Sequence, residues 1–180
     1  KDEITFISEN GAKVIDQGKM IYQNPIQHGK IQQVLQLIEG KAIFDGYRLV
    51  MSGEKAAYIH KNATAEYRKK ADYFYRNLVE VEDYKEVQDV VYKFAFNFAP
   101  EKVQQCEAEL NTFFAGELLA MTSGHEAIDL VNIHSGKDLG IKVLADYWQI
   151  TLDEVAAFGD NLNDFSMIKS VGYGYVVANG

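Results

Sequence analysis

The sequence has only one cysteine, one tryptophan and two prolines among 180 residues, and it contains no repeat or low-complexity segment. The single thiol, Cys106, cannot form a disulfide within the chain. A disulfide-bonded framework is therefore excluded, and a reducing cytoplasm is the expected location. Cys106 falls in a helical pattern, where the expected role is that of a small, packed core residue.

Basic clusters and long apolar runs are also missing. The formal net charge is −8 and the pI is about 5.0, and no patch of Lys and Arg provides the footprint that nucleic-acid binding needs. No apolar run approaches the roughly 18 residues of a membrane span, and the opening Lys1-Asp2-Glu3 is not a signal peptide. We therefore expect no nucleic-acid or membrane partner, and an anionic substrate would need local positive charge to hold it.

What is present is a globular composition, with 47% apolar and 24% charged residues, which is enough to bury a core. The length indicates one domain or slightly more. Because Lys1 is not an initiating methionine, we expect the chain to be cut from a longer one.

Up to about residue 125, short strand patterns alternate with amphipathic helices, as in an α+β region. The turn Asp16-Gln17-Gly18-Lys19 predicts a β-hairpin. Further predicted strands are 4–7, 42–45, 48–51, 91–98, 118–122 and 128–131, and the predicted helices are 27–39, 64–75 and 100–114. Three of these elements have a defined apolar face: helix 27–39 with Ile31, Val34, Leu35 and Ile38, helix 64–75 with Tyr67, Ala71, Phe74 and Tyr75, and strand 91–98 with Tyr92, Phe94, Phe96 and Phe98.

From residue 137 onward the pattern changes to a βαβ rhythm, which indicates a doubly wound parallel sheet. Helices are predicted over 137–148 and 164–170. Wholly apolar strands are predicted over 155–158 and 174–177, as expected in a buried parallel sheet. The predicted class is therefore α/β, with a Rossmann-like core that is incomplete in this sequence and an inserted α+β domain.

The loop Gly159-Asp160-Asn161-Leu162-Asn163-Asp164 follows the predicted strand 155–158. Ligands of open α/β sheets bind at the carboxyl ends of strands, and two carboxylates with two amides are hard oxygen ligands suited to Mg²⁺ or Mn²⁺. The spacing does not fit an EF-hand loop. A turn and helix cap is the alternative, because Asp and Asn favour both, and Asn163 or Asp164 can also cap the following helix.

Lys137 follows His134-Ser135-Gly136 at a predicted helix start. Taken alone, it is more simply a solvated lysine than a catalytic or phosphate-binding one. The four histidines are scattered through the sequence and show no metal-ligand spacing.

Taken together, these segments resemble the third and fourth motifs of the haloacid dehalogenase superfamily, and more narrowly its Cof-type (class IIB) branch, close to the bacterial sugar phosphatases. The matching residues are Lys137, Gly140, Ile141, Leu144, Trp148 and Ile150, then Phe158 to Asp164 with Met167. Residues 1–6, 8–12 and 128–130 match that branch as well, so the resemblance covers essentially the whole chain.

The resemblance implies a magnesium-dependent phosphatase of small phosphate monoesters, with sugar phosphates as the expected substrates. An aspartate attacks the phosphoester to form an aspartyl-phosphate, and a second aspartate two residues later acts as general acid and base. By motif position, Asp160 would ligate Mg²⁺, and Asp164 would support that loop without direct ligation or through water. Asn163 would hydrogen-bond a phosphate oxygen, and Lys137 would bridge the nucleophile and the phosphate.

The sequence departs from the family pattern at its front, because it contains no Asp-x-Asp pair to supply the nucleophile and the acid/base. The family's phosphate-binding Ser or Thr would also precede Lys1. The pattern implies roughly sixty residues ahead of Lys1 and roughly forty after Gly180. We therefore expect the 180-residue chain alone to be inactive and poorly folded, with an unpaired sheet edge.

The resemblance also divides the chain into a core segment at 1–25, an α+β cap at 26–126 and a core segment at 127–180 that carries both motifs. Caps of this kind close over the site, exclude water and choose the substrate. The aromatic face of strand 91–98 is expected to be cap core rather than a sugar platform. Asn10, Gly11 and His125 are further candidates for substrate or site contacts, although a plain turn is favoured at residues 123–125.

Two alternatives to the phosphatase stay open. One is a non-catalytic fragment or degenerate paralogue that binds a phosphorylated ligand, and the other is a phosphotransferase or phosphomutase of the same superfamily. The expected cofactor is Mg²⁺ and the expected partner is a small phosphorylated metabolite. A monomer or weak homodimer is the expected assembly.

Overall fold

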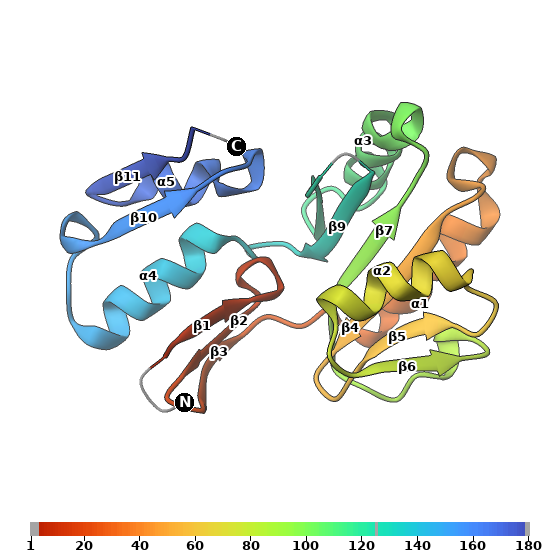
Figure 1. Ribbon diagram of the computed structural model, residues 1–180, viewed down its shortest axis with the longest axis horizontal. Coiled ribbons are helices and arrows are strands. Elements are labelled where there is room, and N and C mark those ends of the chain that lie inside the picture. Colours follow the sequence, from red (N-terminus) through yellow and green to blue (C-terminus); the bar gives the residue numbers. More distant parts are fainter. Residues whose placement is uncertain (1–3, 125, 179–180) are drawn as a thin grey trace. The chain divides into compact units, whose positions relative to one another are not determined.

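The chain crosses twice between two compact units in the computed structural model, which describes residues 4–124 and 126–178 (Figure 1). The first unit comprises residues 1–24 and 132–180, and the second comprises residues 25–131. The sequence predicts the second crossing at residues 126 and 127. In the structure it falls between Val131 and Asn132, at the end of strand β9 (Ala127–Asn132), because this strand pairs inside the sheet of the second unit.

The described part of the first unit contains a three-stranded antiparallel sheet and a separate pair of parallel strands. The sheet consists of β1 (Phe6–Ser8), β2 (Lys13–Asp16) and β3 (Lys19–Gln23), with the 3₁₀ turn η1 (Glu9–Gly11) after β1. The later segment consists of α4 (Lys137–Trp148), η5 (Leu152–Glu154), β10 (Ala156–Gly159), η6 (Leu162–Asp164), α5 (Phe165–Ser170) and β11 (Tyr173–Val176).

The predicted hairpin between β2 and β3 is confirmed. Asp16 pairs with Lys19, and the two turn residues, Gln17 and Gly18, have positive φ angles of 47° and 80°. A two-residue turn with two positive φ angles matches the twist of the strands that it joins. The hydroxyl of Thr5 donates a hydrogen bond of 2.5 Å to the Asp16 carboxylate, which ties the segment before β1 to this turn.

The predicted βαβ unit is present as β10, α5 and β11, with the strands parallel and paired from Ala156–Tyr173 to Gly159–Val176. In this 180-residue chain, whose core the sequence predicts to be incomplete, α5 covers one face of these strands and the other face is exposed. Phe158 is 66% exposed and stacks on Tyr175 with the ring centroids 4.8 Å apart.

Helix α4 has the bounds that the sequence predicts, and it holds the first unit together. It packs against β1, β2 and η1 on one side and against α5 on another. Leu144 and Ala145 are its buried apolar residues. The helix ends where Gln149 adopts a left-handed conformation with φ of 56°, a common helix terminus.

The second unit is a six-stranded sheet with helices on both faces, in the strand order β6-β5-β4-β7-β9-β8 (Figure 1). Its strands are β4 (Arg48–Gly53), β5 (Ala57–His60), β6 (Leu78–Val81), β7 (Val91–Asn97), β8 (Leu118–Thr122) and β9. Its helices are α1 (His28–Gly40), α2 (Ala65–Phe74) and α3 (Val103–Phe113), with 3₁₀ turns at Ala42–Phe44 (η2), Tyr84–Glu86 (η3) and Pro100–Lys102 (η4). Among the described residues, no helix of either unit is long and apolar enough to cross a membrane.

Two apolar clusters cover the two faces of this sheet. Helices α1 and α3 pack on the face that carries Phe94 and Phe96, whose rings stack with centroids 5.9 Å apart. Helix α2 packs on the opposite face, where Val50 and Ile59 lie. Phe94, Phe96, Phe98 and the thiol of Cys106 are buried in the first cluster, and Tyr92 is buried outside it, so the prediction that these are core residues is confirmed.

Two local predictions in this unit are corrected, and two of its strands were missed. The predicted strand 42–45 is the 3₁₀ turn η2, which buries the Phe44 side chain in the first cluster. Phe74, expected on the apolar side of α2, is 67% exposed because the helix ends there and Tyr75 takes the place against the cluster. Strands β5 and β6 were not predicted, since each is a four-residue strand with only weak alternation.

Candidate active site

The candidate site is built on the loop that follows β10. This loop lies at the carboxyl end of a parallel strand, which is where open α/β sheets bind ligands. It turns back on itself at Gly159, where an added Cβ would lie 2.5 Å from the Cβ of Asp164. A glycine is therefore needed for Asp164 to approach the end of the strand.

Asp164 closes the loop through its side chain. Its Oδ2 accepts hydrogen bonds from the backbone N–H groups of Asp160 at 3.1 Å and Asn161 at 3.4 Å. Its own backbone N–H donates to the Asn161 carbonyl at 2.9 Å. The sequence named Asn163 or Asp164 as a residue that can cap α5. The Asp164 side chain makes no capping hydrogen bond to that helix and instead bonds backward to the loop.

The other oxygen of Asp164 accepts a hydrogen bond from the Lys137 ammonium group, and the two side chains form an ion pair. Asp164 is 4% exposed, and burial by itself would raise the pKa of its carboxyl group. The hydrogen bond from Lys137, the Asp160 N–H, the Lys137 charge and the Asn161 N–H outweigh burial, so the pKa is lowered. Asp164 is thus held as a carboxylate, and Lys137 is held at the loop.

Asp160 differs from Asp164 in that it is exposed. Among the described residues, no hydrogen bond or ion pair involves its carboxylate oxygens. Mg²⁺ prefers carboxylate oxygens, keeps several waters and commonly uses only one or two protein carboxylates together with substrate phosphate. Asp160 fits such an ion as one ligand. The described residues hold no cluster of three metal-binding side chains, so they would supply part of a coordination shell.

Helix α4 places Lys137 in its first turn, beside η1. An added Cβ on Gly11, whose φ is 86°, would lie 1.9 Å from the carbonyl oxygen of Gly136. Only a glycine allows this approach and this backbone conformation. The structure therefore brings Gly11, a predicted contact residue, next to the start of α4, with Asn10 preceding it at a positive φ of 52°.

Asn24 is a residue near the site that sequence reasoning missed. Its amide donates to the Ile133 carbonyl at 2.8 Å and to the Ser135 hydroxyl at 3.0 Å, and its oxygen accepts from the Asn132 amide at 2.9 Å. Its backbone N–H donates to the Ala12 carbonyl at 2.8 Å. Asn24 therefore fixes the segment that leads into Lys137. In the sequence it appears only as a polar residue before a proline, which carries no signal of this role.

The structure brings only some of the predicted site residues together. The structure gathers Asp160 and Asp164 with Lys137, and Gly11 lies beside the residue before Lys137. Asn163 lies half-buried in the same loop. His125 lies outside the described residues. The individual roles of these residues in catalysis stay predictions.

The chain belongs to the haloacid dehalogenase-like hydrolases, because the model of that family matches residues 1–180. It is similar to 5-amino-6-(5-phospho-D-ribitylamino)uracil phosphatase YbjI of Escherichia coli (strain K12), with 25% identity over 178 residues, which is 99% of this chain and 65% of YbjI. Phosphatase YwpJ of Bacillus subtilis (strain 168) is 25% identical over 198 residues, 96% of this chain and 68% of YwpJ.

A solved structure shows the same fold. SMU.1108c of Streptococcus mutans UA159 matches with a TM-score of 0.93 and 26% identity, over 99% of this chain and 67% of that one. The predicted family and α/β class are therefore confirmed. The chain spans just under two thirds of YbjI, so the similarity does not by itself assign an activity to the whole protein.

Proposed function

We propose that the protein is a magnesium-dependent phosphatase of small phosphate monoesters, with sugar phosphates as its substrates. The observation that carries this proposal is the Lys137–Asp164 ion pair beside the exposed Asp160 at the carboxyl end of β10. This places one fixed positive charge and one available carboxylate together, as transfer of a phosphoryl group needs. Membership of the hydrolase family and two relatives named as phosphatases support it.

In this proposal the residues of the chain position charge. Lys137 binds a phosphate oxygen and offsets the repulsion between the phosphate and a carboxylate nucleophile. Asp164 orients Lys137 and keeps the loop closed, and Asn163 donates a hydrogen bond to the phosphate. A bound Mg²⁺, held by Asp160, would neutralise charge on the transferring group. The attacking aspartate is not in this sequence, which has no Asp-x-Asp pair.

The test uses protein expressed from its complete gene. Phosphate release is measured with Mg²⁺ on a panel of sugar phosphates, to which the substrate in the name of YbjI is added. We expect activity that EDTA removes, and a loss of at least about 100-fold in kcat for Asp160→Asn. The matched control is Asp146→Asn, since Asp146 is an exposed carboxylate in α4. Wild-type turnover in Asp160→Asn would overturn the assignment.

Lys137 is tested in the same assay against Lys142, which is exposed on the same helix. Lys137→Ala should lower kcat/KM at least about 100-fold, whereas Lys142→Ala should change it little. A second candidate is a non-catalytic protein that binds phosphate esters. Saturable binding of a sugar phosphate that depends on Lys137, without phosphate release, would identify that candidate. We also propose that the protein is cytoplasmic and is a monomer or weak homodimer.

A further inference from the structure

The two crossings of the chain between its units are joined by a pair of asparagines. Asn24 is the last residue of the first unit before the chain leaves it, and Asn132 is the first residue after the chain returns. The Asn132 amide donates a hydrogen bond to the side-chain oxygen of Asn24 at 2.9 Å. The point of exit and the point of return are therefore tied together within the first unit.

The amide group of Asn24 extends this tie toward the candidate active site. It donates one hydrogen bond to the Ile133 carbonyl at 2.8 Å and another to the Ser135 hydroxyl at 3.0 Å. Ser135 is buried, and it lies two residues before Lys137. Both amide hydrogens and the oxygen of Asn24 are thus used, which leaves its side chain one orientation.

The segment that Asn24 holds has a strained backbone. His134 lies between Ile133 and Ser135 and has a φ of 62°, in the left-handed region that a residue with a Cβ adopts only at a cost. The N–H of Ser135 closes this turn on the Asn132 carbonyl at 3.2 Å. The two bonds donated by Asn24 flank the strained residue, so they oppose its relaxation.

The turn over residues 132–135 decides where α4 begins. No side chain caps this helix at Gly136. Its start is therefore set by the turn before it and by the contact of Gly11 with the Gly136 carbonyl. Lys137 is the first residue of the helix, and its ammonium group reaches Asp164 from there. A shift of the turn would shift Lys137 with it.

We propose that Asn24 is a positioning residue for Lys137, and that it links the placement of Lys137 to both crossings of the chain. It acts through the turn at residues 132–135 and touches no substrate. Its effect on catalysis rests on the proposed role of Lys137 in phosphoryl transfer. A small displacement of a group that must meet the phosphate is enough to lower the rate.

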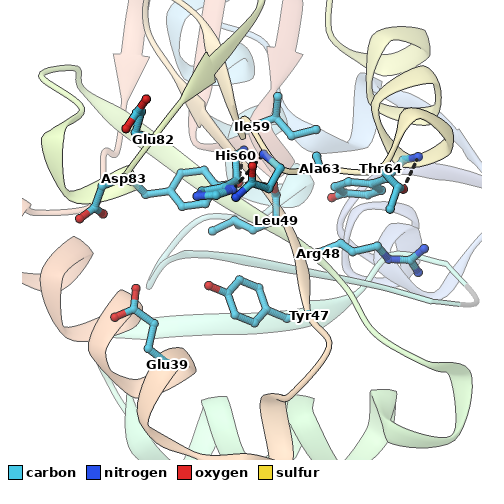
Figure 2. Close-up of a pocket in the computed structure, with 13 residues that line it drawn as sticks. Glu39, Tyr47, Arg48, Leu49, Ile59, His60, Ala63, Thr64, Glu82 and Asp83 are labelled. Atoms are coloured by element: carbon cyan, nitrogen blue, oxygen red, sulfur yellow. Dashed lines mark hydrogen bonds between the residues drawn. The ribbon is translucent and has the colours of Figure 1, made fainter.

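The second unit contains comparable side-chain bonds that do not lead to the candidate site. The amide of Asn111 donates to the Ala120 carbonyl at 3.0 Å, and its oxygen accepts from the Ala120 N–H at 2.9 Å. At a pocket of about 490 Å³ in this unit (Figure 2), the Tyr84 hydroxyl donates to the Leu49 carbonyl at 2.6 Å and accepts from the His60 N–H at 2.9 Å. Asn111→Ala and Tyr84→Phe are therefore the matched controls.

The first test is amide hydrogen exchange in the complete protein without substrate. The Gly140 N–H bonds to the Gly136 carbonyl at the start of α4, and the Ile150 N–H bonds to the Ala145 carbonyl just beyond its end, both at 3.0 Å. Asn24→Ala should accelerate exchange at Gly140 at least about fivefold more than at Ile150, because only the start of the helix is released. Both controls should leave the ratio of the two rates unchanged.

Ser135→Ala removes one of the two bonds that Asn24 donates, and it should change the same ratio in the same direction by a smaller factor. It carries the test if Asn24→Ala does not fold. Equal acceleration at Gly140 and Ile150, or no acceleration at either, would overturn the proposal, since Asn24 would then support the fold in general or not at all. This readout does not depend on phosphatase activity.

The second test is a double-mutant cycle on phosphate release. Asn24→Ala should lower kcat/KM at least about fivefold in the wild type but less than about twofold in Lys137→Ala, because no ammonium group is then left to position. Equal factors in the two backgrounds, or an equal loss in Asn111→Ala, would contradict a role through Lys137. If the wild type releases no phosphate, the proposed function fails, and the exchange rates still decide whether Asn24 holds the start of α4.

Discussion

The two units differ in how far they bury their large apolar side chains. In the second unit the large side chains close around two clusters, and Phe94 is completely buried. In the first unit the strands β10 and β11 expose theirs, and Phe158 is 66% exposed. Yet the first unit carries the ion pair and the exposed carboxylate of the candidate active site. In this chain the second unit therefore buries the larger apolar core, whereas the site of the first unit is held by hydrogen bonds and glycine contacts.

The largest contrast is expected from the two phenylalanines. Phe94→Ala should lower the free energy of unfolding by about 3–5 kcal/mol, because it leaves a cavity in a closed cluster. In the 180-residue chain, Phe158→Ala should change it by no more than about 0.5 kcal/mol, since 66% of that side chain is exposed to solvent. Urea unfolding followed by circular dichroism measures both. Equal losses would show that β10 is covered in the native protein and would break the comparison.

The next contrast uses two glycines with similar backbone angles in the first unit. Gly11 and Gly18 have φ of 86° and 80°, but only Gly11 lies against another backbone. In both alanine variants a residue with a Cβ is strained in the left-handed region of backbone angles. Gly11→Ala should cost about 1–3 kcal/mol more than Gly18→Ala, because the Gly136 carbonyl must move. Thermal unfolding and the KM for a phosphate ester measure the effect. Identical behaviour of the two variants would contradict the role of Gly11 in placing α4.

Asn24 allows a similar test of the hydrogen bonds that hold the segment before Lys137. Asn24→Ala should destabilise the protein by about 1–3 kcal/mol, because it leaves several polar partners unsatisfied. The control is Asn77→Ala, which removes a single exposed bond to the Lys55 carbonyl and should cost less than about 1 kcal/mol. Denaturant unfolding gives both values. If Asn77→Ala proved the more costly, the segment before Lys137 would not depend on Asn24.

The smallest expected effect is a pH dependence in the second unit. Asp89 accepts hydrogen bonds from the N–H of Lys55, the hydroxyl of Tyr58 and the N–H of Val90. Burial would raise the pKa of its carboxyl, but these bonds outweigh burial and lower it. Its contribution to stability is therefore present above the unfolded pKa of about 3.9 and is lost as the pH falls through the folded value.

Asp89→Asn removes that carboxyl, so its stability should fall less than that of the wild type on acidification. Urea unfolding between pH 6 and about pH 3 makes the comparison. An identical acid dependence in the two proteins would contradict it.

Much of the fold could be predicted from the sequence because its signals are local. Helical spacing placed α1 and α4, the Gln17-Gly18 turn placed its hairpin, and the alternation of β7 placed an aromatic core strand. Strands β5 and β6 could not be found, since four residues give too little alternation to distinguish a strand from a loop. The exposure of Phe158 in this chain could not be predicted either, because an apolar run does not show which segments cover it.

The sequence by itself determined the chemistry that the candidate site can offer. A strand end followed by Asp160, Asn163 and Asp164, with Lys137 upstream, specifies oxygen ligands and one cation, because side-chain type and local spacing suffice for that. Only the tertiary structure decided the arrangement. It paired Lys137 with Asp164, left Asp160 exposed and recruited Asn24 from far along the chain. Groups distant in sequence meet only when the sheets and helices pack, which local spacing does not specify.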